Sequence, residues 1–417
     1  MKLELTSALS RNTTDFPAVV SISENGDKVY AVYGITVDNN VNLAAELFKN
    51  RDGGLASVNT IRGDLDYSSI DSGHASRDFT KFSVLDDNQS VNDSKARIRT
   101  LNSKLQIVAE RIFTDAFLPG YTFVGGQFSP NGSLVAVSYA LGPALLGGSQ
   151  SSILRILDAN TLVDVASYEF VAGVSVGGAT FFNFNRGLYV TIVTSQGILD
   201  FNNLACAAKP EYNVHVFSLS GNTLTKVVKQ QIPQNSFGVT AFNKDARVYL
   251  LIGTFRAILN EINFYADDCN ACYQAGTLVD GDELRIYKFT GEALTRISSV
   301  NRNQTIQSPV LHPDGRHLIF GQTSSDVNSN EAGFFQLVKL DGEYQIKYSR
   351  LGLAAPHFFT ARFSEDGNWL IVGGANSNND SKNLHNILLY KVSLSVICED
   401  DSSSSSSATP PCKYRKI

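Results

Sequence analysis

Several features that often reveal a function are missing from this chain. Charged residues make up only 18% of it and the net charge is −5, with no dense run of Lys or Arg. The sequence therefore shows no sign of a nucleic-acid-binding surface. It also has no run of about 18 apolar residues, so we expect no transmembrane segment. The G-x-S-x-G elbow, the P-loop and the H-E-x-x-H zinc motif are all absent, and no catalytic residue is predicted.

The N-terminal residues, MKLELTSALS, lack the apolar core of a signal peptide. Two explanations stay open. Either the protein does not use that secretion route, or the numbered chain is a processed form that begins with an added methionine. Met1 is the only methionine, which fits the second explanation.

Cysteine is scarce, and the count of five is odd, so at least one thiol is free or pairs with another chain. Cys269 and Cys272 form a lone C-x-x-C, without the second pair of ligands that a structural zinc site needs. We expect one disulfide from Cys206 to Cys269 or Cys272 and a second between Cys398 and Cys412. Such bridges would indicate an oxidising compartment.

Six N-x-S/T sequons add weak support for an extracellular or surface-associated glycoprotein; they begin at Asn12, Asn88, Asn92, Asn131, Asn303 and Asn379. About as many arise by chance in a chain this rich in Asn, Ser and Thr. The alternative is a cytoplasmic scaffold with reduced cysteines.

What the sequence has in abundance is a repeated pair of strands. FSPNGSLVAVSYA (Phe128–Ala140) reads as a short strand, a tight turn and an almost wholly apolar strand. The same pattern returns in Ser21–Gly34, Phe182–Ser195, Ala241–Thr254, Val310–Thr323 and Arg362–Ala375. A second, alternating hairpin follows most of these units, so a repeat supplies four antiparallel strands, A to D.

The repeated turn consists of Ser, Asn or His, one further residue, Asp or Asn, and then Gly, between an apolar residue and an apolar strand. This pattern resembles the strand A–B hairpin of WD-type and YVTN (lactonase-like) β-propellers, and it covers residues 3–396. The WD dipeptide and the GH motif are absent from the blades. Scaffolds, lectins, lactonases and dehydrogenases share such folds.

Six repeats predict an all-β, six-bladed β-propeller with four antiparallel strands per blade. Seven blades are the alternative, because the first two units lie almost twice as far apart as the others. We expect the extra residues, Ile35–Phe79, to be an insertion in which Val41–Asn50 has weak helical periodicity. In the first repeat, Thr80–Asp87 and Lys104–Phe113 are then expected to be strands C and D.

The last repeat lacks a strand D, and the N-terminal residues Leu3–Leu9 have no blade of their own. We expect this N-terminal strand to pair with Ile387–Val396 and close the ring, which removes exposed sheet edges. Residues 1–397 then form a single propeller domain. Residues 398–417 form a Ser-rich tail of disordered composition, a linker or an O-glycosylated stem.

The connections place the predicted site at one end of the ring. In a four-stranded blade the B–C and D–A connections share an end, and here the A–B turns are uniform while the B–C connections vary in length. The D–A connections supply six candidate ligand-binding residues: Phe16, Tyr121, Phe123, Phe237, His357 and Phe358. They predict an aromatic funnel for a glycan or a protein segment. The alternative is that these aromatics only pack the first residues of the inner strands.

The lactonase-like resemblance implies a rival function, a metal-dependent hydrolase at the channel mouth. It would use His357 as base and acidic loop residues for calcium, among them Asp267, Asp268 and Asp280–Glu283. No EF-hand spacing is present, and acidic clusters in loops are usually solvated. We therefore expect a non-catalytic binding propeller without a cofactor, which recognises a protein or carbohydrate partner.

Overall fold

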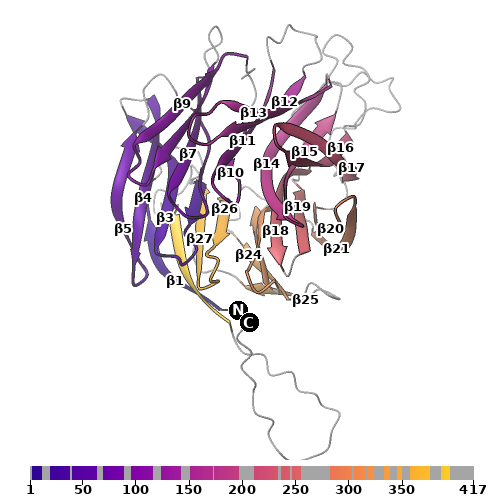
Figure 1. Ribbon diagram of the computed structural model, residues 1–417. Coiled ribbons are helices and arrows are strands. Elements are labelled where there is room, and N and C mark those ends of the chain that lie inside the picture. Colours follow the sequence, from indigo (N-terminus) through magenta and orange to yellow (C-terminus); the bar gives the residue numbers. More distant parts are fainter. Residues whose placement is uncertain are drawn as a thin grey trace, which may run out of the picture.

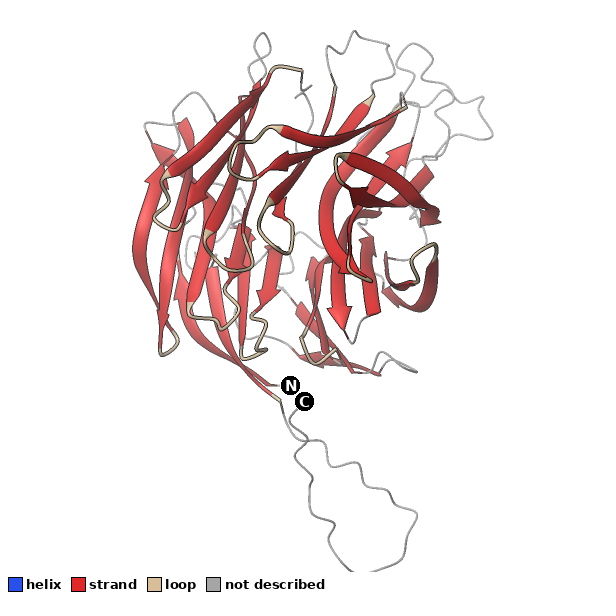
Figure 2. Ribbon diagram, in the orientation of Figure 1, coloured by secondary structure: helices blue, strands red, loops and turns tan. Residues whose placement is uncertain are grey.

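A computed structural model gives the fold for most of the chain. It describes residues 2–11, 19–37, 40–62, 69–88, 95–115, 124–141, 151–171, 173–196, 211–232, 236–244, 247–254, 282–302, 305–315, 317–323, 333–338, 345–349, 357–375 and 387–394. All regular elements among them are β-strands (Figure 2). No helix in this described part could cross a membrane.

The described strands form seven four-stranded antiparallel sheets, or blades, each with its strands in the order A to D from the axis outward. The first three blades follow one another along the chain. Blade 1 comprises β2 (Val19–Ile22), β3 (Lys28–Val37), β4 (Asn40–Arg51) and β5 (Gly54–Arg62). Blade 2 comprises β6 (Ser69–Ala75), β7 (Lys81–Asn88), β8 (Lys95–Asn102) and β9 (Ile107–Phe113). Blade 3 comprises β10 (Val124–Phe128), β11 (Leu134–Ala140), β12 (Ser152–Asp158) and β13 (Asp164–Phe170).

The remaining four blades complete the order. Blade 4 comprises β14 (Val174–Phe184), β15 (Gly187–Gln196), β16 (Glu211–Ser220) and β17 (Thr223–Ile232). Blade 5 comprises β18 (Ser236–Lys244), β19 (Arg247–Thr254), β20 (Asp282–Phe289) and β21 (Leu294–Arg302). Blade 6 comprises β22 (Thr305–Leu311), β23 (His317–Thr323), β24 (Gly333–Val338) and β25 (Gln345–Ser349). Blade 7 comprises β26 (His357–Phe363), β27 (Trp369–Ala375), β28 (Ile387–Ser393) and, as its outer strand, β1 (Lys2–Leu9).

The inner strands form a closed circuit around the axis (Figure 1). Strand A of each blade contacts strand A of the next, from β2 through β6, β10, β14, β18 and β22 to β26, which contacts β2 again. The chain is therefore a β-propeller, as the repeats predicted. Its described strands make seven blades, the alternative count, rather than six.

The additional blade arises from the segment predicted to be an insertion. Ile35–Phe79 contains the end of β3, all of β4 and β5, and β6. Val41–Asn50, with its weak helical periodicity, lies in the long strand β4 and pairs with β3 and β5. Six consecutive β4 residues, Leu43–Phe48, are buried, because a strand within a blade is covered on both faces by the neighbouring blades. A short apolar run of this kind fits a helix or a buried strand equally well by pattern.

The hairpin that begins blade 2 was missed because its turn lacks glycine. Phe79 has φ 55° there, the left-handed region that Gly26 (φ 73°) and Gly132 (φ 68°) occupy in neighbouring blades. Its ring is buried and meets the ring of Phe82 edge-on at 5.6 Å, which offsets the backbone strain. The segments assigned to strands C and D of the first repeat are in fact strands B and D of blade 2, β7 and β9.

The predicted closure of the ring is confirmed. β1 pairs antiparallel with β28, with Leu3 opposite Val392 and Leu9 opposite Ile387. Beyond the backbone ladder, the Thr6 hydroxyl donates a 3.0 Å hydrogen bond to the Leu389 carbonyl. The chain's first residues thus complete its last blade.

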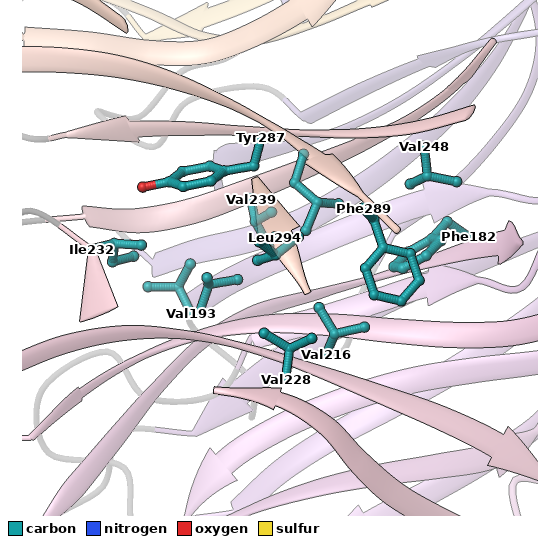
Figure 3. Close-up of a cluster of buried hydrophobic side chains, with 12 residues drawn as sticks. Phe182, Val193, Val216, Val228, Ile232, Val239, Val248, Tyr287, Phe289 and Leu294 are labelled. Atoms are coloured by element: carbon teal, nitrogen blue, oxygen red, sulfur yellow. The ribbon is translucent and has the colours of Figure 1, made fainter. Parts of the chain in front are cut away.

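The hydrophobic core lies between the blades, not in a single central mass. Between blades 4 and 5, for example, Phe182, Val216 and Phe289 point toward one another from facing sheets (Figure 3). The strand-B residues that form apolar runs in the sequence are buried on both sides, as Val135, Ala136 and Val137 show at 0% exposure. Burial of two-sided strands between sheets is the main stabilising term for this fold.

Candidate functional site

The two ends of the ring differ in their connections. At one end, A–B turns join strands over short, similar spans, such as Phe128 to Leu134 or Phe363 to Trp369. At the other end, B–C connections range from the step between Val37 and Asn40 to the span between Thr254 and Asp282. The predicted gathering of variable connections at one end of the ring therefore holds for the described strands.

The A–B turns share one hydrogen-bonding pattern. Ser23, Ser76, Ser129 and Ser364 occupy the same position in four turns. Each hydroxyl donates to an Asn or Asp side chain two residues on and accepts the N–H of the residue five positions on. Such local side-chain bonds fix the turn.

Neighbouring A–B turns also bond to one another. The Lys81 ammonium donates to the Gly132 carbonyl across blades 2 and 3, at 3.1 Å. The Asp366 N–H donates to the Glu24 carbonyl across blades 7 and 1, also at 3.1 Å. The A–B end of the ring thus carries four turns with one hydrogen-bonding pattern, and bonds between turns link blades 2 and 3 and blades 7 and 1. We refer to these turns as the turn layer. The connections that vary in length lie at the opposite end.

Half of the predicted funnel residues lie in described strands. Phe237 is in β18, and His357 and Phe358 are in β26, all at the start of an inner strand at the D–A end. The pairing of these inner strands with strand B is irregular close to the three residues, between Ser236 and Gly238 in β18 and between Phe358 and Thr360 in β26. Phe16, Tyr121 and Phe123 lie outside the described residues. The aromatic funnel stays a prediction, because the structure describes only the backbones of Phe237, His357 and Phe358.

The cysteine and acidic-cluster predictions also stay untested. Cys206, Cys269, Cys272, Cys398 and Cys412 all lie outside the described residues. So do Asp267, Asp268, Asp280 and the Ser-rich tail, and the described strand β20 begins at Asp282.

The sequence reasoning missed a set of polar residues at one equivalent position of the inner strands. Ser21, His74, Gln127 and Arg362 take the same position in β2, β6, β10 and β26, two residues before the turn serine. Each pairs with the third residue of strand B: Tyr30, Ser83, Ala136 and Ile371. Val310 of blade 6 is the apolar counterpart, opposite Ile319. Aligning the repeats on their turns would have revealed this polar position.

The charge of Arg362 affects the ionisation of His74. Burial lowers the pKa of His74 from 6.5 to about 3, and the Arg362 guanidinium lowers it further in the same direction, while a backbone hydrogen bond with Gly125 opposes both. His74 is therefore neutral at physiological pH. Burial also lowers the pKa of Arg362, whose reported hydrogen bond goes from Nη1 to the Ala361 carbonyl at 2.9 Å.

A second candidate, for metal binding, lies in the A–B turn of blade 6. His312, Asp314 and His317 offer ligand atoms that lie within 4.8 Å of one another. However, His312 fills the place of the turn serine: its Nδ1 accepts the Asp314 N–H at 3.1 Å and its Nε2 bonds the Gly367 carbonyl at 2.9 Å. Both ring nitrogens already have partners, so this group fits a turn that joins blades 6 and 7 better than a metal site.

The buried charges between blades also have structural roles. Asp86 of β7 is fully buried and accepts hydrogen bonds from Arg97 (2.9 and 2.7 Å) and Arg99 (2.8 Å) of β8. Glu46 of β4 accepts from Arg11 at 3.0 Å and from the Tyr33 hydroxyl at 2.6 Å. The second group ties the segment after β1 to blade 1. Paired, hydrogen-bonded charges such as these are what a buried location permits.

Comparison with known proteins confirms the fold and no more. No protein-family model and no curated protein sequence matches this chain. By shape, 727 chains of solved structures match, so the architecture is too widespread to indicate one activity.

Three solved structures illustrate the range. Hydrazine synthase of Kuenenia stuttgartiensis is 11% identical, with a TM-score of 0.55, over 92% of this chain and 98% of that one. A protein of Bacteroides fragilis with a proposed 6-phosphogluconolactonase activity is 13% identical, with a TM-score of 0.48, over 87% and 89%. The β-propeller domain of the trilobed protease from Pyrococcus furiosus is 10% identical, with a TM-score of 0.47, over 90% and 96%. At such identities the likeness concerns the β-propeller fold alone.

Proposed function

We propose that this chain is a non-catalytic binding propeller, which recognises a glycan or protein partner at the end of the ring that carries the B–C and D–A connections. The observation that supports this is the contrast between the two ends. One end repeats the same short, hydrogen-bonded turn, whereas the other carries connections as unequal as Val37 to Asn40 and Thr254 to Asp282. Repeat proteins vary most where they bind.

Phe237, His357 and Phe358 begin inner strands at this end, and we propose that a ligand entering along the axis meets their side chains first. Aromatic rings at such a position suit sugar faces and peptide side chains, because they offer large apolar area at small entropic cost. We also propose an extracellular or surface-associated location. Non-reducing peptide mapping tests it, and a finding that all five thiols are free would reject the disulfides and the location together.

The binding function is tested with the full chain on a glycan array, with a lactone-hydrolysis assay in parallel. We expect a specific saccharide signal that falls at least tenfold in Phe237→Ala or Phe358→Ala. The matched control is Val163→Ser, which alters an exposed side chain (62% exposed) in the C–D turn of blade 3, at the opposite end.

Replacement of residues 255–281 by a short Gly-Ser linker tests the longest connection separately. Lactone hydrolysis that a chelator abolishes would overturn the proposal in favour of the metal-dependent hydrolase. A saccharide signal that Val163→Ser and Phe358→Ala reduce equally would also overturn it, because recognition would then not be confined to one end.

A further inference from the structure

The inner strands carry a charged group whose partner is not evident. Arg362 lies in β26, the strand closest to the axis in blade 7, and is only partly exposed. Its hydrogen bond to the carbonyl of Ala361, the preceding residue, uses one of five N–H donors. No ion pair joins it to a carboxylate among the described residues, and burial is the single cause that lowers its pKa. A guanidinium held in this way usually serves an anionic ligand or costs stability.

The relation to His74 shows where the Arg362 side chain lies. β26 and β6 belong to blades 7 and 2, and blade 1 stands between them in the ring. Ile371, the cross-strand partner of Arg362, packs with Val20 and Val29 of blade 1, so the arginine faces that side. Arg362 and His74 hold equivalent positions in the inner strands β26 and β6, on either side of blade 1, so the axis is where their side chains can approach one another. The effect of the guanidinium on the pKa of His74 agrees with this arrangement.

Other groups at this level provide hydrogen bonds. Gln127 holds the equivalent position in β10 and is partly exposed, although its strand is the innermost of blade 3. Ser21 holds it in β2, where its hydroxyl accepts the Ala75 N–H at 3.3 Å.

We propose that Arg362, His74 and Gln127 form an oxyanion site on the ring axis, for the phosphate or carboxylate group of a small ligand. Arg362 supplies the charge and a planar pair of N–H donors, the geometry that carboxylate and phosphate oxygens match. Neutral His74 and Gln127 add hydrogen bonds without competing charge. Arg362 lies five residues along β26 from His357, roughly 15 Å at the usual rise per residue. The site is thus separate from the funnel of the proposed function and stands or falls independently of it.

The test is calorimetric titration of the full chain with inorganic phosphate and, separately, with acetate, which distinguishes a phosphate from a carboxylate ligand class. We expect one of the two ions to bind with 1:1 stoichiometry. Arg362→Gln should weaken binding at least tenfold, while Arg362→Lys, which keeps the charge, should lose less. The control is Arg77→Gln, which removes the same formal charge from an exposed residue that pairs with Glu24 and Glu365 in the turn layer.

Nuclear magnetic resonance of the wild-type histidines gives a second measurement that needs no variant. The bound ion should shift the His74 ring resonances and raise the pKa of His74, and leave those of His215, buried among Phe170 and Phe217 away from the axis, unchanged. Equal affinity in Arg362→Gln and wild type would overturn the proposal. So would wild-type affinities weaker than about 10 mM for both ions, a free energy too small for a built site.

Discussion

Replacement of Asp86 by Asn should be among the most damaging isosteric changes in the described part of the chain. The Asp86 carboxylate is 0% exposed and accepts three hydrogen bonds from Arg97 and Arg99, whose side chains are 3% and 4% exposed. Asp86→Asn keeps the shape but leaves two guanidiniums buried without their shared counter-charge. Loss of one partner from a buried ion pair costs about 3–5 kcal/mol.

The lower part of that range is expected for a structural reason. Arg97 retains Glu110 at 3.6 Å, and this carboxylate is 40% exposed, so part of the charge of Arg97 remains balanced. Arg99 has no such second carboxylate among its described ion pairs, and its Nε is buried without a hydrogen-bond partner. We therefore expect the free energy of unfolding to fall by about 3 kcal/mol.

The assay is urea denaturation followed by circular dichroism, with midpoints compared at unchanged slope. Asp164→Asn is the matched control: Asp164 also accepts from two arginines, Arg111 and Arg155, but is 39% exposed, so its loss should cost about 0–1 kcal/mol. The triple variant Asp86→Leu, Arg97→Met, Arg99→Met should recover most of the stability, because apolar groups of similar volume need no counter-charge. Equal midpoints for Asp86→Asn and Asp164→Asn would refute the reasoning.

Three further predictions concern other parts of the ring. Gly26→Ala should lower the free energy of unfolding by about 2–3 kcal/mol, because its Cβ would lie 2.1 Å from Cδ1 of Trp369 and the backbone has φ 73°. Gly221→Ala, at φ 55° with nothing within 4 Å of its Cβ, should cost about 1 kcal/mol. Thermal melts compare the two variants, and similar losses would contradict the packing argument. Burial lowers the pKa of His215 from 6.5 to about 4, so the unfolded chain binds its proton first, and this histidine alone should lower stability by up to about 1.4 kcal/mol per pH unit as pH drops from 6.5 to 4. His74, whose pKa is also lowered, adds a slope of the same sign. His215→Gln should therefore remove the His215 share of the slope in urea midpoints, and an unchanged slope would count against it. Arg362→Met should add about 1 kcal/mol to the free energy of unfolding of the ligand-free protein and so raise its melting temperature, and a lower melting temperature would mean that Arg362 has a structural partner.

The fold was largely readable from the sequence because its signal repeats. Turn chemistry at Ser129 or Ser364, followed by an apolar strand, recurs with little change, and each copy supports the interpretation of the others. The prediction of the blade count failed at one place in the chain. Phe79 takes the left-handed turn position without being glycine, so one hairpin escaped the pattern, and the buried run Leu43–Phe48 of β4 had no alternation to distinguish it from a helix.

The axial group was beyond the sequence for a different reason. Arg362 and His74 come from blades 7 and 2, and only closure of the ring puts these two blades on either side of blade 1. Their shared position before the turn was visible, but its meaning depends on the number of blades and on which strand is innermost. The six funnel residues were chosen as members of D–A connections; Phe237, His357 and Phe358 lie instead in the inner strands β18 and β26, and the funnel itself stays a prediction.

Blade 7 is built from both ends of the described chain, so it can be completed only after β28 has been synthesised. β1 leaves the ribosome before the other described strands, yet its partner β28 ends at Ser393, so β1 stays without its partner strand until β28 has been made. Until then the nascent ring is an open arc with an unmatched sheet edge that invites association with other chains. A message truncated before the codon for Ile387 would lack β28, so its product would keep β1 unpaired and the ring unsealed.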